Sequence, residues 1–428
     1  MNYDVIIIGS GPAGLFSAHE LAGMGRTVAL IDLKSNMNDI ASRACSMQLI
    51  LDDDYEGEGI VVENSTFRFP KSGFSVPYNS KLVPIFKKYY RSPNGNTISF
   101  GDGKKPFSYK FDKSELLHGI YEECLKMGVS VYMNHLCTAV KDLRTHVEVT
   151  ICDFNDNHAK KTLRCNKLID AEGVNASIAQ KLGMNKHRKH LATALTYKCV
   201  VKGIKGIEKN SWNLFYGKAY HTNAPVIIGP SLLGDEYNEV TISSDKNYRP
   251  DKAFSDIISN SPISDCFKGS EVVEEHGCSV KAFTPMKNPC KGNVIVIGDA
   301  AAFVEVETQG ALLCGYHAAK AVNAELNGEK GWNSYTAWWQ KSFEFNGDDY
   351  LRVSQGYSLV PTYTDRDLDY LFSLVKDKCL IGTYSQYKTP KLIWKTIREH
   401  DEKIRRERPS IFEKICNLNQ MSLASSFE

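Results

Sequence analysis

The chain has 428 residues, enough for two or three domains, and its 42% hydrophobic and 24% charged residues are typical of a globular protein. A formal net charge of +2 provides no overall positive field, which disfavours nucleic acid as a partner. No apolar run is long enough for a membrane span and no signal peptide is recognised, so we expect a cytoplasmic protein. The twelve cysteines form no CxxC pair, which disfavours a metal site and indicates reduced thiols.

A glycine-rich motif lies at the start of the chain, where "VIIIGSGPAG" occupies residues 5–14. Four apolar residues predict a buried strand, and the apolar spacing after the glycines predicts a helix. Gly9 would permit the tight turn, Gly11 would let a pyrophosphate approach the backbone, and Gly14 would let helix and strand pack closely. The motif therefore predicts a dinucleotide site, and NAD, NADP and FAD all bind to such a turn.

A second strand, "RTVALID", follows this helix and ends in Asp32. An acidic residue at this distance from the first glycine suits a ribose hydroxyl and would repel a 2′-phosphate. Asp32 therefore disfavours NADP as the ligand.

The remaining segments alternate between strand-like and helical patterns. Residues 55–110 predict short strands and turns, and residues 112–128 predict a helix capped by Asp112 or Ser114. Residues 197–280 are again mostly strand-like, and the last hundred residues are helical and aromatic. We therefore predict an α/β fold in which a Rossmann-type domain is interrupted by a β-rich substrate domain and followed by a helical C-terminal region. The expected boundaries are 1–75, 110–190 and 281–330 for the discontinuous nucleotide-binding domain, 76–109 and 191–280 for the substrate domain, and 331–428 for the helical region.

A second block, "GNVIVIGDAAAFVEVETQGALLCGYHAAKAV", identifies the cofactor. It predicts a buried strand that stops at Gly298 and Asp299 and a helix that resumes after Gln309 and Gly310. A carboxylate at the strand end can accept a hydrogen bond from a ribityl hydroxyl, and amides at a helix start can face a flavin. Together with the first glycine motif, this block predicts FAD.

Three segments resemble the FAD-dependent oxidoreductases of the para-hydroxybenzoate hydroxylase and geranylgeranyl reductase group: "GSGPAG" with Asp32, "LIDAEGVNASIAQKLG" and "GDAAAFVEVETQGALLCG". The resemblance implies a Rossmann-type fold and non-covalent FAD. It also implies three groups of cofactor contacts. These are Gly9, Gly11, Ala13, Gly14 and Asp32 on the ADP half, Gly298 and Asp299 at the ribityl chain, and Gly310 and Ala311 at the isoalloxazine edge.

The geranylgeranyl reductase branch is the more similar one. "ASRACS" places Cys45 where that branch often carries a cysteine near the flavin, and the adjacent Arg43 could reach a phosphate. Cys45 is accordingly the candidate catalytic residue, although a small buried packing residue is the alternative reading. The branch's Tyr-x-Trp-x-Phe-Pro motif is missing, so the sequence supports an apolar or unsaturated substrate but not a geranylgeranyl chain in particular.

Two further departures concern loops. The proline expected after Gly-Asp-Ala-Ala is replaced by the run 305–307, where Glu305 and Glu307 either handle a proton near the ring or form a polar turn. In the middle segment Glu172 stands in place of the family's aspartate. The basic run "HRKH" at 187–190 meets an anion or is a solvated loop.

The resemblance implies a reductase or dehydrogenase that transfers a hydride between flavin N5 and a carbon–carbon bond of an organic substrate. The alternative is a monooxygenase that hydroxylates an aromatic substrate through a flavin hydroperoxide. Only one glycine fingerprint follows a strand, so electrons would come from a ferredoxin, a flavoprotein or a transiently bound NAD(P)H. A charged helix near the C-terminus predicts a solvated face, with peripheral membrane contact as the alternative.

Overall fold

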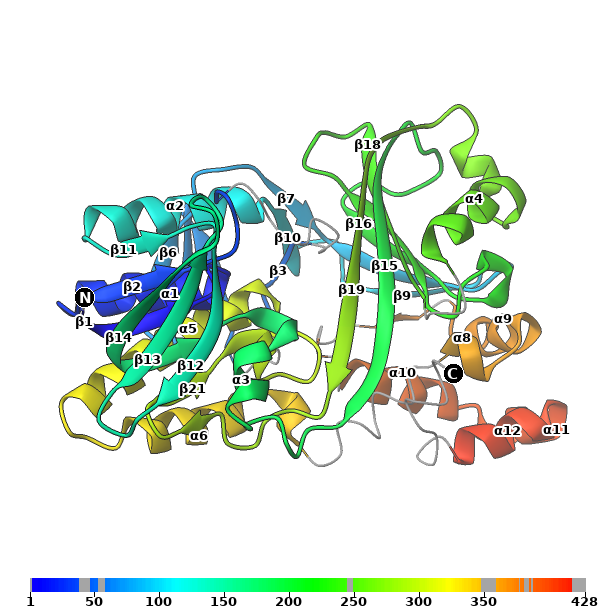
Figure 1. The fold of residues 1–428 in the computed structure, drawn as a ribbon. Helices are drawn as coiled ribbons and strands as arrows, with labels where there is room; N and C mark the ends of the chain where they lie inside the picture. Colours follow the sequence, from blue (N-terminus) through cyan, green and yellow to red (C-terminus); the bar gives the residue numbers. More distant parts are fainter. Residues whose placement is uncertain are drawn as a thin grey trace.

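The protein is represented by a computed structural model that describes residues 2–37, 47–52, 58–244, 249–347, 359–376, 378–380, 385 and 388–417. Two large sheets dominate it, one beside the N-terminus and the other beside the C-terminal helices (Figure 1).

The first sheet has a parallel core in the strand order β11-β2-β1-β14-β21. The bounds of these strands are Asn2–Ile8 for β1, Val28–Ile31 for β2, Ser130–Tyr132 for β11, Ala159–Asp170 for β14 and Val294–Val296 for β21. This order is typical of a doubly wound dinucleotide-binding sheet, in which ligands bind beyond the carboxyl ends of the strands. The predicted α/β fold is confirmed.

Both faces of this parallel core are covered, which explains why β1 is a continuous apolar run. Val5 and Ile7 share a core with α1 (Pro12–Gly23), α2 (Lys113–Lys126) and α5 (Glu307–Leu326). Ile6 and Ile8 point to the opposite face, which β12 (His135–Asp142) and β13 (Val147–Asp153) cover. The helix α2 begins as predicted, because the Asp112 side chain accepts hydrogen bonds from the N–H groups of Ser114 and Glu115.

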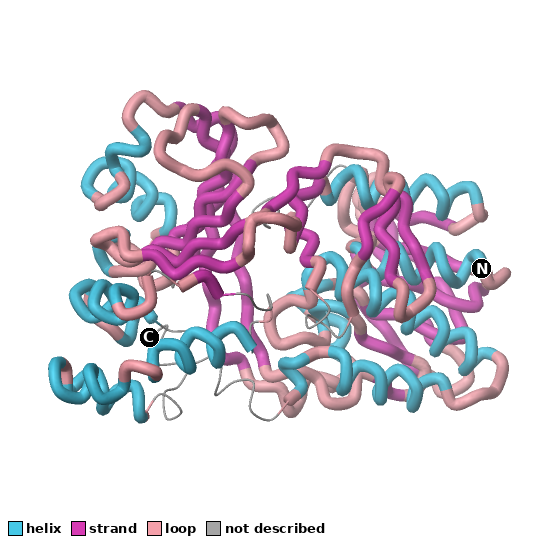
Figure 2. The backbone as a smooth tube through the Cα atoms, turned by 180° about the vertical axis from the view of Figure 1, so that it is seen from behind, coloured by secondary structure: helices cyan, strands magenta, loops and turns pink. Residues whose placement is uncertain are grey.

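The second sheet has the order β19-β15-β18-β17-β16-β8-β9-β22. Its strands are β8 (Lys87–Arg91), β9 (Thr97–Phe100), β15 (His190–Lys202), β16 (Ser211–Phe215), β17 (Val226–Pro230), β18 (Tyr237–Ser244), β19 (Glu271–Phe283) and β22 (Cys379–Leu380). One face packs on α4 (Pro250–Asn260), and the other packs on helices near the C-terminus. Seen from behind, the strands form separate groups with helices on their outer sides (Figure 2).

Two small sheets and several short elements complete the connections between the large sheets. The small sheets are β3 (Gln48–Ile50), β10 (Ser108–Phe111) and β7 (Leu82–Ile85), and β4 (Val61–Glu63), β5 (Thr66–Phe69) and β6 (Phe74–Pro77). The short elements are β20 (Cys290–Lys291) and α3 (Ser177–Lys181).

The C-terminal region is helical, as predicted, with α6 (Gly331–Ser342), α8 (Leu359–Thr362), α9 (Asp365–Ser373), α10 (Lys388–Arg398), α11 (Asp401–Glu407) and α12 (Pro409–Cys416). The charged segment that was expected to be one solvated helix forms three, α10 to α12. Pro409 begins the last of them, because the residue before a proline is biased away from helical geometry. Trp394, Ile397 and Ile404 are buried against the second sheet, so this segment is only partly solvated.

Two expectations concern the whole chain. No helix in the described ranges has the length and apolar composition needed to cross a bilayer. The eleven cysteines in those ranges form no disulfide with one another, and the same residues contain no group of three or more candidate metal ligands.

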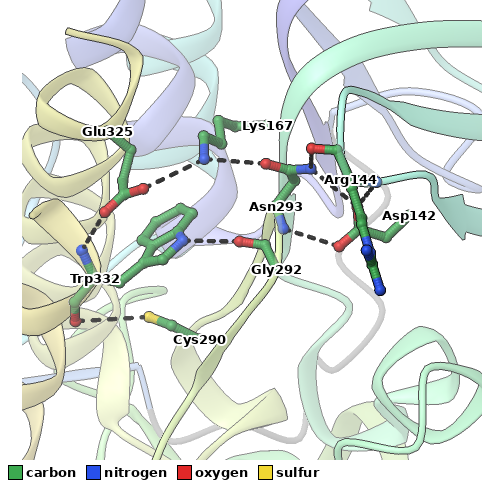
Figure 3. Close-up of polar contacts among 8 residues, drawn as sticks. All are labelled: Asp142, Arg144, Lys167, Cys290, Gly292, Asn293, Glu325 and Trp332. Atoms are coloured by element: carbon green, nitrogen blue, oxygen red, sulfur yellow. Dashed lines mark hydrogen bonds and ion pairs between the residues drawn. The ribbon is translucent and has the colours of Figure 1, made fainter. Parts of the chain in front are cut away.

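A polar network beside the start of β21 joins the first sheet to α5 and α6 (Figure 3). The Lys167 amine donates to Asn293 Oδ1 at 3.1 Å and to Glu325 Oε2 at 3.3 Å. The other Glu325 oxygen accepts the Trp332 N–H at 3.1 Å, and Lys167 lies 5.1 Å from the Trp332 ring centroid. These contacts fix the position of α6 on the first sheet.

Gly292 is the tightest point of this network. Its φ is +58°, and an added Cβ would lie 2.0 Å from Asp142 Oδ2, which accepts the Asn293 N–H at 2.9 Å. We expect Gly292→Ala to lower the free energy of unfolding by about 3 kcal/mol, from backbone strain and the displaced carboxylate. Denaturant unfolding tests this against Gly128→Ala, where φ is +81° and no atom lies within 4 Å of the new Cβ. Equal losses in the two variants would contradict the role given to the Asp142 contact.

Candidate flavin site

The glycine turn has one position that the protein leaves open. A Cβ on Gly9 would lie 2.2 Å from the Ala171 carbonyl oxygen, and one on Gly14 would lie 1.9 Å from the Gly9 carbonyl oxygen. A Cβ on Gly11 would meet nothing within 4 Å, although Gly11 immediately precedes the free amides of α1. Gly9 and Gly14 are therefore required by packing, whereas the space beside Gly11 fits an external pyrophosphate.

Asp32 follows β2 at the same edge of the sheet. Its Oδ2 accepts hydrogen bonds from the Ser10 N–H at 2.5 Å and the Ser10 hydroxyl at 2.7 Å, and its Oδ1 accepts the Lys34 N–H at 2.8 Å. The carboxylate is thus held beside the glycine turn, where a ribose would lie. The Lys34 amine, 4.0 Å from Asp32 Oδ2, was not anticipated from the sequence.

The second predicted block, which contains Gly298 and Asp299, packs against Ala13 of the glycine turn. A Cβ on Gly298, whose φ is +63°, would lie 3.3 Å from the Ala13 Cβ. Further along the second block, in α5, a Cβ on Gly315 would lie 2.6 Å from the Ala13 carbonyl oxygen. Helices α1 and α5 therefore approach closely, and the two blocks expected to bind one FAD molecule are adjacent in space.

Asp299 is half-buried and is held by the start of α5. Its Oδ1 accepts the Val306 N–H at 2.9 Å, a bond that a proline at this position could not form. Among the described residues, no hydrogen bond is made to Asp299 Oδ2, so this oxygen can accept a ribityl hydroxyl. Burial raises the pKa of Asp299, while the Val306 bond and the charge of Lys113 oppose the rise.

Two further carboxylates lie beside Asp299. Glu305 has an exposed side chain, yet the protein packed around its carboxyl and the negative charge of Asp299 raise its pKa to about 7, while the charge of Lys113 opposes the rise. Burial and the charges of Glu305 and Asp299 raise the pKa of Glu307 well above its usual value, and Lys113 opposes the rise. Glu307 is also strained, with a φ of +56° at the first residue of α5. The raised pKa values allow this group to hold protons near neutral pH.

The helix α5 begins at Glu307, four residues before the predicted start after Gly310. The buried Gln309 side chain explains the difference, since it accepts the Ile50 N–H at 2.9 Å and donates to the Ile50 carbonyl at 3.2 Å. This tertiary contact fixes the first turn against β3. Gly310 and Ala311 are buried within that first part of α5.

Arg188 is a residue whose role sequence reasoning missed. It was expected to meet an anion or to be solvated, but its guanidinium donates to the carbonyls of Ala300 at 2.7 Å, Ala302 at 2.5 Å and Thr284 at 2.8 Å. Burial lowers its pKa to about 10, so it is still charged at neutral pH. Arg188 holds the backbone of the loop that follows Asp299.

We expect Arg188→Met to lower the free energy of unfolding by about 3 kcal/mol, because buried carbonyls lose their donor. The loop after Asp299 should also shift, so FAD affinity should fall further than stability alone predicts. Thermal unfolding with and without FAD checks both effects, with Lys189→Met as the exposed neighbouring control. Unchanged FAD affinity in Arg188→Met would contradict its role in positioning the loop.

In the segment "LIDAEGVNASIAQKLG", two carboxylates bind the start of α3. The Glu172 carboxylate accepts the Ser177 hydroxyl at 2.7 Å and the Ile178 N–H at 2.7 Å. Asp170, fully buried at the end of β14, accepts the N–H groups of Glu172 and Ala179. Both carboxylates therefore cap α3. The predicted residues Arg43 and Cys45 lie outside the described residues.

Comparison with known proteins agrees with this geometry. A family model described as FAD binding domain matches residues 2–309, so the chain belongs to that family. The digeranylgeranylglycerophospholipid reductase of Methanococcus vannielii is 24% identical over 363 residues, covering 81% of this chain and 85% of that protein.

Solved structures show the same fold. A geranylgeranyl bacteriochlorophyll reductase-like protein from Thermoplasma acidophilum has a TM-score of 0.71 at 15% identity, covering 97% of this chain and 99% of that chain. The p-nitrophenol 4-monooxygenase of Pseudomonas putida has a TM-score of 0.59 at 16% identity, covering 96% and 98%. The protein is an FAD-dependent oxidoreductase, as predicted, and the named sequence relatives favour a reductase over a monooxygenase.

Proposed function

We propose that this protein reduces carbon–carbon double bonds in the isoprenoid chains of a lipid. The proposal is supported by the position of the glycine turn, which has open space at Gly11, next to the Asp299 loop. The chain's sequence relatives are named digeranylgeranylglycerophospholipid reductases. The missing Tyr-x-Trp-x-Phe-Pro motif gave no support for this substrate, so the relatives' names carry that part of the proposal.

Bound FAD supplies a hydride for the double bond. The chain would hold the ADP half through the α1 amides and Asp32, and the ribityl chain through Asp299. We assign Glu305 as the proton donor to the second carbon, because it lies beside Asp299 and remains partly protonated near neutral pH. Cys45 and Arg43 stay proposals based on the family resemblance.

The predicted division into domains is part of this proposal. Residues 1–75, 110–190 and 281–330 would bind the cofactor, and residues 76–109 and 191–280 would form the substrate domain. The strands of the second sheet support this division, since all but β22 and the ends of β15 and β19 come from the latter ranges. Residues 331–428 would form the helical region, in which α6 packs on the first sheet and the helices from α8 onward support the second sheet from its other face.

The test is anaerobic photoreduction of the FAD-loaded protein, followed by mixing with a digeranylgeranyl glycerophospholipid in detergent. We expect reoxidation of the flavin and a product heavier by two hydrogens for each double bond reduced, detected by mass spectrometry. The matched sample contains the saturated lipid, which should leave the flavin reduced. If the lipid does not reoxidise the reduced flavin, and oxygen does so while an aromatic compound is hydroxylated, the proposal is overturned in favour of the monooxygenase.

A further inference from the structure

A groove with a volume of about 380 Å³ lies between the end of α1, the second half of α5 and the start of α6. These three helices all belong to the half of the molecule that holds the first sheet (Figure 1). The volume is within the range of small-molecule sites. None of the residues that line the groove is assigned to the flavin site described above.

The floor of the groove is low because α6 begins directly on α5. A Cβ on Gly331, the first residue of α6, would lie 1.9 Å from the Ala321 carbonyl oxygen. The short side chains of Ala321 and Ala324 line the groove along α5, between Met24 at the end of α1 and Ser334 on α6. A hollow therefore remains between the two neighbouring helices.

Two asparagines on α5 supply hydrogen-bond donors to this groove. Asn323 and Asn327 are four residues apart and lie on the same face of the helix. Their Oδ1 atoms accept hydrogen bonds from Arg26, at 2.7 Å from Nε and 2.5 Å from Nη2. Because a guanidinium only donates, these bonds fix the orientation of both amides. Among the described residues, no hydrogen bond involves either amide nitrogen, so both NH2 groups are available to a ligand.

The two ends of the groove carry opposite charges. At one end the amine of the exposed Lys320 lies 5.1 Å from the Tyr316 ring centroid and forms no ion pair within the described ranges. Burial and the charge of Lys320 lower the pKa of the adjacent His317 to about 4, so this ring is neutral at neutral pH. At the other end, Glu329 in the turn before α6 supplies a carboxylate.

The spacing of these groups suits an elongated ligand. Lys320, Asn323 and Asn327 lie along one stripe of α5, and the rise from the first to the last is about 10 Å. A cation, two amide donors and a carboxylate therefore follow one another along the groove. This order matches a molecule that has an acidic group at one end and hydroxyl groups along the remainder.

We propose that this groove binds a small hydroxylated organic anion of the sugar phosphate class. Its acidic group would pair with Lys320, its hydroxyl oxygens would accept hydrogen bonds from Asn323 and Asn327, and one hydroxyl would donate to Glu329. Inorganic phosphate would make only the first of these contacts, and a neutral sugar would lack it. The proposal does not depend on the proposed lipid reduction, because the groove shares no residue with the flavin site.

The test is calorimetric titration of the FAD-loaded protein with glucose 6-phosphate as the probe. The loaded protein is used so that the cofactor occupies the glycine turn and the probe cannot bind there. We expect a Kd below about 1 mM, and at least about tenfold weaker binding of both glucose and inorganic phosphate.

The variant Asn323→Asp/Asn327→Asp tests the two amide donors. Each aspartate can still accept the hydrogen bond from Arg26, but an oxygen that repels an anion replaces the NH2 group. We expect no binding of glucose 6-phosphate up to about 10 mM, with a thermal unfolding temperature no lower than that of the wild type. The matched control, Asn157→Asp/Asn260→Asp, changes two exposed asparagines elsewhere and should bind like the wild type.

Lys320→Met is a second variant that retains the Arg26 contacts entirely, and it should bind glucose 6-phosphate at least about tenfold more weakly. A wild type that binds no glucose 6-phosphate up to about 10 mM overturns the proposal. Equal affinities for glucose 6-phosphate and inorganic phosphate also overturn it, because the hydroxyl groups would then make no contact. Unchanged binding in Lys320→Met or in Asn323→Asp/Asn327→Asp would place the anion outside this groove and overturn it as well.

Discussion

Replacing Gly11 by alanine is expected to weaken FAD binding by at least about tenfold while leaving the fold intact. Its φ of −71° and ψ of 179° suit any residue, and an added Cβ would touch no protein atom within 4 Å. The new methyl group would instead occupy the space through which a pyrophosphate approaches the α1 amides. The free energy of unfolding of the FAD-free protein should change by less than about 0.5 kcal/mol.

The neighbouring glycine should show the opposite behaviour. In Gly14→Ala the Cβ would overlap the Gly9 carbonyl oxygen, 1.9 Å away, so we expect a loss of about 3 kcal/mol in the free energy of unfolding. Gly23→Ala, at the open end of α1, should leave both stability and FAD affinity nearly unchanged. Fluorescence titration with FAD and denaturant unfolding measure the two quantities separately. Normal FAD affinity in Gly11→Ala would show that the pyrophosphate does not lie at this turn.

Local patterns predicted the elements that depend on local chemistry. The apolar run of β1, the glycine turn and the Asp112 cap of α2 all involve residues within a few positions of one another. The glycine turn and the Gly298-Asp299 motif lie far apart in the chain, and both were placed in the same α/β domain. This was possible because each motif marks the carboxyl end of a parallel strand, β1 or β21.

The features that sequence reasoning missed depend on distant contacts. Gln309 extends α5 toward Glu307 through its two hydrogen bonds to Ile50, 259 positions away. Arg188 binds carbonyls more than one hundred positions away, although its surroundings in the sequence are those of a solvated loop. A basic residue in a polar run has the same sequence signal in either setting, so only the fold distinguishes them.

Glu305 is expected to give the reduction its dependence on pH. A proton donor must be protonated, and the raised pKa of Glu305, about 7, keeps that form available at neutral pH. The rate at which an olefin reoxidises the reduced protein should therefore be highest below pH 7 and should fall as the pH rises through about 7. In Glu305→Gln, which cannot donate a proton, the rate at pH 6 should fall by about 100-fold and the pH dependence should disappear.

Glu307→Gln is the matched control, because it removes a carboxylate two residues away. The charges that act on the Glu305 pKa come from Asp299 and Lys113, so the inflection near pH 7 should persist in this variant. FAD affinity, measured in parallel by titration, should stay similar in both variants, since neither side chain is assigned a contact with the cofactor. A flat pH profile in Glu307→Gln together with a normal profile in Glu305→Gln would transfer the role of proton donor to Glu307. Normal rates and profiles in both variants would mean that the acidic run at the start of α5 is a structural turn and that the proton comes from another group.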